Sequence, residues 1–188
     1  MEVGRGFSVS LPRVGPVPHA PLLVDIAAAN MSPLTNIILD AAAREDVVAA
    51  VDSLYADLQK EIAARKPVCT MSGRCCRFEE FGHRLYATTA ELAAFVAHHR
   101  QSPTIRRRDA WDGTGCPWQV DKACEAHAFR PFGCRIYFCD PSAKQWQEET
   151  YERYHQRLKV LHEQFAVPYR YVEWRLAIRS VPGLADAD

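Results

Sequence analysis

Cysteine residues constrain the fold of this chain more than any other feature of its sequence. The 188 residues include seven cysteines, and these fall into two groups, between residues 69 and 76 and between residues 116 and 139. The entropic cost of closing a loop grows only slowly with its length, so short loops can gather the thiols of each group. The sequence therefore predicts one shared site built from Cys69, Cys75, Cys76, Cys116, Cys124, Cys134 and Cys139.

The chemistry of these thiols depends on the compartment. Residues 1–13 carry charges at Glu2, Arg5 and Arg13, unlike a secretory signal, and no segment has the roughly 18 consecutive apolar residues of a membrane span. We therefore expect a cytoplasmic protein without a membrane partner, in which thiols stay reduced. Thiolates bind zinc and iron well. We predict that at least four of the seven cysteines hold an iron–sulfur cluster or Zn²⁺.

The nuclearity of the centre and the identity of the four ligands stay open. Cys75 and Cys76 are adjacent, and adjacent side chains of an extended chain point in opposite directions. Both can reach one zinc ion only where the backbone kinks, which slightly favours a polynuclear iron–sulfur centre. The alternative, a small buried apolar group, describes a lone cysteine better than seven in two tight groups.

Composition narrows the classes of function. Lysine plus arginine equals aspartate plus glutamate at 23 each, so the charge gives no argument for a nucleic-acid partner. The apolar fraction of 48% allows an ordinary globular core. The sequence lacks a phosphate-binding glycine loop, a G-x-S-x-G turn and an H-E-x-x-H pair. It indicates no catalytic residue and identifies no protein partner.

The order of elements follows from periodicity and breakers. Prolines predict an irregular N-terminal arm over residues 1–36, and residues 37–188 are expected to form a single cysteine-cluster domain with its motif core at 66–140. Apolar residues at steps of three and four predict helices over 40–65 and 142–165. Thr88 or Thr89 with Glu91 predicts the start of a helix that ends near His99.

The remaining segments are shorter. Residues 83–86 are a candidate strand, 101–115 a loop, and 169–178 either a strand or a short helix. The predicted fold is mostly α with irregular cysteine-rich loops, a small α+β domain around a metal centre.

The second cysteine group contains Cys124, then Arg130-Pro131, then Cys134-Arg135, an aromatic residue and Cys139. In this order the residues resemble the YkgJ-type cysteine-cluster family, which is described as a zinc- or iron-chelating domain. The first group resembles the C-x-x-C-x-x-C-C signature of that family, with Ser72 in place of the second cysteine. The resemblance covers roughly residues 66–140 and implies a metal centre of iron–sulfur or zinc type.

Arg130 and Arg135 are the residues predicted to contact the cofactor, because a cation lowers the pKa of nearby thiols and offsets their charge. Surface ion pairs explain these arginines equally well, and His127 is a second-choice ligand. The predicted role of the centre is structural or electron-transferring. The alternatives are a metal chaperone or sensor, and an enzyme that uses the centre. A few longer relatives in the YkgJ family look like flagellin lysine methylases. This chain lacks the length of those enzymes, so we do not extend their activity to it.

Overall fold

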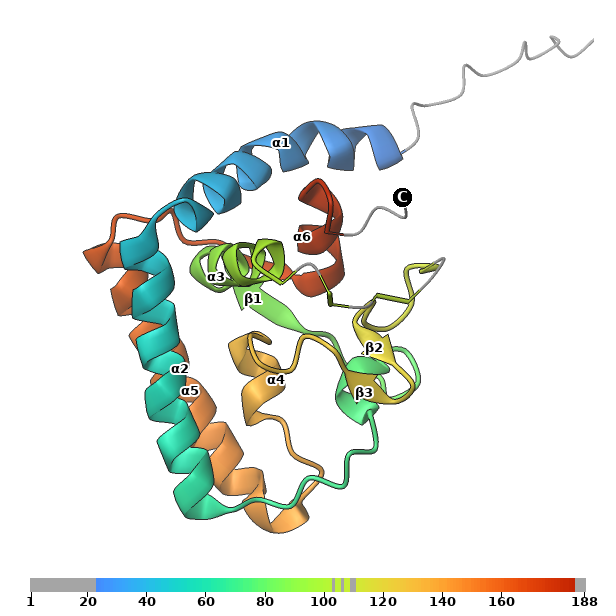
Figure 1. The fold of residues 1–188 in the computed structure, drawn as a ribbon, viewed down its shortest axis with the longest axis vertical. Coiled ribbons are helices and arrows are strands. Elements are labelled where there is room, and N and C mark those ends of the chain that lie inside the picture. The colour runs from blue at the N-terminus through green and yellow to red at the C-terminus, as the bar shows by residue number, and fades with distance from the viewer. Residues whose placement is uncertain (1–22, 103, 106, 109–110, 185–188) are drawn as a thin grey trace, which may run out of the picture.

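The computed structural model describes residues 23–102, 104–105, 107–108 and 111–184, and most of them are helical (Figure 1). The α-helices are α1 (Leu23–Ala42), α2 (Glu45–Arg65), α3 (Thr89–Arg100), α4 (Phe132–Ile136), α5 (Lys144–Gln164) and α6 (Trp174–Ser180). Two short 3₁₀ helices are η1 (Arg74–Cys76) and η2 (Pro141–Ala143). The predicted mostly helical fold with a small α+β content is confirmed. No helix among these residues is long and apolar enough to cross a membrane.

The first helix corrects the expected N-terminal arm. The prediction of irregular structure up to residue 36 is wrong from Leu23 onwards, where α1 begins, and residues 1–22 lie outside the described residues. Pro33 lies inside α1, and a proline inside a helix costs about 3 kcal/mol. Ile38 is fully buried, and Leu34 and Leu39 pack against the same apolar cluster. Each fully buried aliphatic side chain contributes about 1.5–3 kcal/mol, so tertiary packing offsets the cost of the proline.

The helix predicted over residues 40–65 is divided into two. Arg44 is extended, with φ −97° and ψ 104°, and its guanidinium donates a 2.7 Å hydrogen bond to the carbonyl oxygen of Phe165. α2 then ends at Arg65, as expected, and buries one face through Val47, Val51, Leu54, Tyr55 and Leu58. This face packs along α5, which lies beside α2 in Figure 1.

α3 forms the centre of the molecule. Thr88 accepts a hydrogen bond from the Glu91 N–H while the Glu91 carboxylate accepts one from the Thr88 N–H, which forms a capping box. Of the two threonines predicted to begin this helix, Thr88 is therefore the N-cap. Its first eight residues, from Thr89 to Val96, are all buried. Leu92, Phe95 and Val96 join the apolar cluster next to α1 and α6, whereas alanines of the same helix join the cluster next to α2 and α5.

Two antiparallel strand pairs accompany the described helices. β1 (Tyr86–Thr88) pairs with β4 (Tyr171–Glu173), with Tyr86 opposite Glu173. β2 (Gln119–Val120) pairs with β3 (Ala123–Cys124) through a tight turn. The strand expected at 83–86 thus forms slightly later, and the segment 169–178 contains both predicted alternatives, β4 followed directly by α6.

Candidate metal centre

All seven cysteines line one cavity of about 530 Å³. They come from six places along the chain. Cys69 follows α2, Cys75 and Cys76 lie in η1, and Cys116 precedes β2. The other three are distributed over β3, α4 and the loop before η2, at Cys124, Cys134 and Cys139. The structure therefore brings together the two groups that are far apart in the sequence.

A close contact between backbones joins the two groups. The Cys116 N–H donates a 2.8 Å hydrogen bond to the Cys76 carbonyl oxygen. Gly115 has φ +60°, and a Cβ atom at this position would lie 2.9 Å from the same oxygen. Only glycine accommodates both the left-handed backbone and the close approach. Gln119 adds a 3.0 Å hydrogen bond from its side-chain amide to the Gly73 carbonyl oxygen.

The thiols of the first group converge on those of the second. The sulfur atoms of Cys75 and Cys76 lie 3.9 Å apart, because η1 supplies the kink that an extended chain lacks. The adjacency of Cys75 and Cys76 therefore does not distinguish a polynuclear centre from a single metal ion. Cys116 and Cys124 lie close enough to the Cys76 thiol to raise its pKa, so four thiols form the centre of the group.

Charge differs among these thiols. A hydrogen bond from the Cys76 thiol and the positive charge of Arg130 lower the pKa of Cys75 to about 6. The same two groups lower the pKa of Cys124. The pKa of Cys76 is raised by its thiol neighbours, and burial raises the pKa of Cys134. The site therefore favours thiolates at Cys75 and Cys124, and a thiolate is the form that binds metal.

Cys139 and Cys69 are the cysteines with contacts or exposure outside this group of thiols. The Cys139 sulfur lies 3.7 Å from the hydroxyl oxygen of Ser72, the residue that replaces a cysteine of the family signature. Cys69 is exposed. His127 and Phe138 also line the cavity. Because position 72 is a serine, it supplies a hydroxyl contact to Cys139 and no thiol.

The two predicted arginines occupy different environments. Arg130 lines the cavity, and its charge acts on Cys75, Cys124 and Cys134. Arg135 is not among the residues that line it. The Arg135 guanidinium donates hydrogen bonds to the carbonyl oxygens of Ala128 (2.7 Å) and Arg130 (2.8 Å) and lies over the Tyr55 ring. Arg135 thus holds the backbone before α4, with Arg130 facing the thiols.

Unpaired hydrogen-bond donors belong to three residues that line the cavity. The Arg130 Nε, Trp118 Nε1 and Trp174 Nε1 atoms are buried, and none has a hydrogen-bond partner among the described residues. An unsatisfied buried donor costs about 1–3 kcal/mol. A ligand that accepts hydrogen bonds would remove this cost. Neither tryptophan could be predicted as part of the site, since nothing in the local sequence separates them from ordinary core residues.

The sulfur atoms do not close around a single point. No three His, Cys, Asp or Glu side chains among the described residues lie together as a preformed site for a metal ion. Zinc with Zn–S bonds of about 2.3 Å requires all four sulfurs within about 4 Å of one another. Thiolates are soft donors, but the described residues do not form a closed four-sulfur site of this kind.

Comparison of the chain with known protein families, with curated proteins and with solved structures finds no match.

Proposed function

We propose that this protein holds a metal centre through its cysteines, and that the centre is an iron–sulfur cluster. The proposal rests on one observation, the cavity lined by all seven cysteines. Thiolates are the usual ligands of iron–sulfur clusters, and the thiol-rich wall supplies more than the four that one cluster needs. The proposal includes membership of the YkgJ-type family, which is supported by the order of Arg130-Pro131 and Cys134-Arg135.

Two features favour a cluster over a single zinc ion. The cavity of about 530 Å³ is much larger than one ion, and all seven cysteines line it. The unpaired N–H groups of Arg130, Trp118 and Trp174 are donors, and the sulfides of a cluster accept hydrogen bonds. A four-coordinate zinc site, in contrast, is saturated by its ligands and offers such donors only the thiolate sulfurs.

The proposed role of the centre is structural or electron-transferring. Trp118 and Trp174 are buried beside it and limit the access of water, which tunes a reduction potential. A second candidate, a metal chaperone or sensor, is favoured by the exposure of Cys69, since an exposed thiol can pass a metal to another protein.

Elemental analysis of anaerobically purified protein tests the proposal. We expect iron and acid-labile sulfide in stoichiometric amounts, with the brown colour and charge-transfer absorption of a cluster. Zinc without colour would replace the cluster by a zinc site. Neither metal above trace would refute the proposal. Rapid loss of the metal to a mild chelator would favour the chaperone or sensor.

Two cysteine variants locate the centre. Cys134→Ser should lower both the metal content and the melting temperature, because the free energy of metal binding contributes to folding. Cys69→Ser is the matched comparison, and we expect a smaller effect on both quantities because Cys69 is exposed. An unchanged melting temperature in Cys134→Ser would contradict a structural role for the centre.

A further inference from the structure

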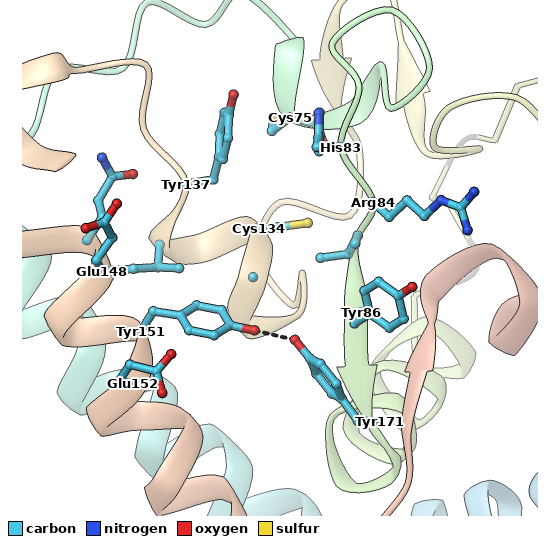
Figure 2. Close-up of a pocket in the computed structure, with 14 residues that line it drawn as sticks. Cys75, His83, Arg84, Tyr86, Cys134, Tyr137, Glu148, Tyr151, Glu152 and Tyr171 are labelled. Carbon is cyan, nitrogen blue, oxygen red and sulfur yellow. Dashed lines mark hydrogen bonds between the residues drawn. The ribbon is translucent and has the colours of Figure 1, made fainter. Parts of the chain in front are cut away.

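A second cavity, of about 380 Å³, adjoins the cysteine cavity. Cys75, Cys134 and Tyr137 line both cavities. Figure 2 shows the second cavity extending from Cys75, His83 and Tyr137 to the hydroxyl groups of Tyr151 and Tyr171. Its volume lies within the roughly 300–1,000 Å³ of pockets that bind small molecules.

Aromatic rings from separate elements form the walls of this pocket. Tyr86 of β1 stacks against Tyr171 of β4 with ring centroids 5.3 Å apart. His83 stacks against Tyr137 at 5.5 Å. Tyr151 of α5 hydrogen-bonds to the Tyr171 hydroxyl group across the pocket (Figure 2). The faces of such rings carry partial negative charge and attract cations.

The tyrosines are neutral, so the formal negative charge of the pocket comes from carboxylates. Burial raises the pKa of Tyr151 and of Tyr171, which keeps both phenols protonated at neutral pH. Glu148 and Glu152 of α5 line the pocket and lie on either side of Tyr151 in Figure 2.

Ion pairs with nearby cations neutralise little of the negative charge of Glu148 and Glu152. Glu148 approaches Lys144 only at 4.0 Å, with both side chains mostly exposed, so this pair is weak. Glu152 has no ion pair with any described residue. Arg84 also lines the pocket, but Figure 2 shows its guanidinium pointing away from the tyrosine pair.

We propose that this pocket binds a small molecule that carries a primary ammonium group on a short alkyl chain. The ammonium group packs against the rings of Tyr151 and Tyr171 and donates hydrogen bonds to their hydroxyl oxygens. The exposed carboxylates of Glu148 and Glu152 on α5 attract its charge. The alkyl chain extends between the rings towards Cys134 and Tyr137. The ligand thereby reaches the wall that the pocket shares with the proposed metal centre.

Calorimetric titration of the full chain, purified anaerobically, tests the inference with n-butylammonium as the probe. 1-Butanol, which has the same carbon chain without charge, and butyrate, which has the opposite charge, are the comparisons. We expect n-butylammonium to bind at least about fivefold more tightly than either, since contacts of a cation with aromatic faces and carboxylates are lost in both. Equal binding of 1-butanol, or tighter binding of butyrate, would overturn the assignment.

Variants assign the binding to this pocket. The double change Glu148→Gln and Glu152→Gln should weaken n-butylammonium binding about fivefold. Tyr151→Leu should weaken it by a similar factor through the loss of a ring. Glu163→Gln, the same change on α5 outside the pocket, should leave the affinity as it is. Undiminished affinity in both pocket variants, with melting temperatures showing that they fold, would refute the proposal.

The result is separable from the test of the metal centre, because the contacts with the ammonium group lie on α5 and β4 rather than on the cysteines. Metal content is measured on the same samples. Metal-free protein that still binds n-butylammonium would refute the metal centre alone. Metal-loaded protein that does not bind it would refute the ammonium site alone.

Discussion

Arg130 is the residue that links the charge of the site to its thiols. The hydrogen bond from Cys76 is the main cause of the lowered pKa of Cys75 and of Cys124, and the Arg130 guanidinium lowers both pKa values further. The Arg130 Nε–H has no hydrogen-bond partner among the described residues. A guanidinium beside thiolates also offsets the repulsion between them. Arg130 therefore favours the deprotonated state that metal binding requires.

Replacement of Arg130 tests this link. Arg130→Gln should release the proposed metal to a chelator faster than the native protein, because loss of the guanidinium raises the pKa of Cys75 and Cys124 and lets protons compete better for these thiols. The chelator-dependent loss of absorbance measures the rate. Arg170→Gln, an exposed arginine whose guanidinium contacts only a backbone carbonyl oxygen among the described atoms, is the control. Equal rates in the two variants would remove Arg130 from the site.

His162 carries a pH dependence that is independent of the metal. Burial lowers its pKa, its Nδ1 is 3.0 Å from the Val167 carbonyl oxygen, and its Nε2 accepts from the Ala90 N–H. The folded state thus takes up a proton at lower pH than the unfolded state, whose histidine pKa is about 6.5. This contribution to stability is complete above that value and falls as the pH decreases below it.

Denaturant unfolding at several pH values measures this effect. Between pH 6.5 and 5.5 the native protein should lose up to about 1 kcal/mol more stability than His162→Gln, which cannot be protonated. The difference between the two proteins isolates His162, since His99, His127 and His155 also have lowered pKa values in both. Parallel curves would show that His162 is not buried in the neutral form.

The elements predicted correctly are those whose start or apolar face depends on residues close together in the sequence. Thr88 and Glu91 define the start of α3 in any context, because the capping box is formed within four residues. The periodic apolar face likewise predicted α5 to within two residues. α1 escaped prediction because its proline is tolerated only through packing against distant helices. The break at Arg44 depends on the carbonyl oxygen of Phe165, which is equally remote in sequence.

Gly115 lies where the loop before Cys116 packs against the backbone of Cys76. Gly115→Ala should destabilise the protein by about 1–3 kcal/mol more than Gly82→Ala and should reduce its metal content. Both glycines have positive φ, but a Cβ at residue 82 meets nothing within 4 Å, whereas one at residue 115 meets the Cys76 carbonyl oxygen. Thermal unfolding and elemental analysis compare the two variants. Equal losses would mean that the close approach has no energetic weight.

At the scale of the whole molecule, metal and fold are expected to stabilise each other. Removal of the proposed metal under reducing conditions should lower the melting temperature, by about 2–4 °C for each kcal/mol of binding free energy that is lost. Reconstitution with iron and sulfide should restore the transition. A melting temperature that is insensitive to both treatments would show that the apo cavity is already stable without a ligand.

The sequence predicted which residues form the candidate site better than it predicted their arrangement. Cysteines in two groups were enough to propose a shared site, and the structure places all seven around one cavity. The roles of Trp118 and Trp174 could not be predicted, because only the three-dimensional packing leaves their N–H groups unpaired there. The same holds for the tyrosine pocket, whose walls come from β1, α5 and β4.

Trp174 has a consequence for how the protein is made. It lines the cysteine cavity from α6, although the last cysteine is Cys139. A ribosome that adds about 5–20 residues per second therefore exposes every thiol for several seconds before this wall of the cavity exists. During synthesis the seven cysteines are present before the wall that contains Trp174 completes the cavity. The proposed metal centre can therefore be loaded before the wall that contains Trp174 has formed.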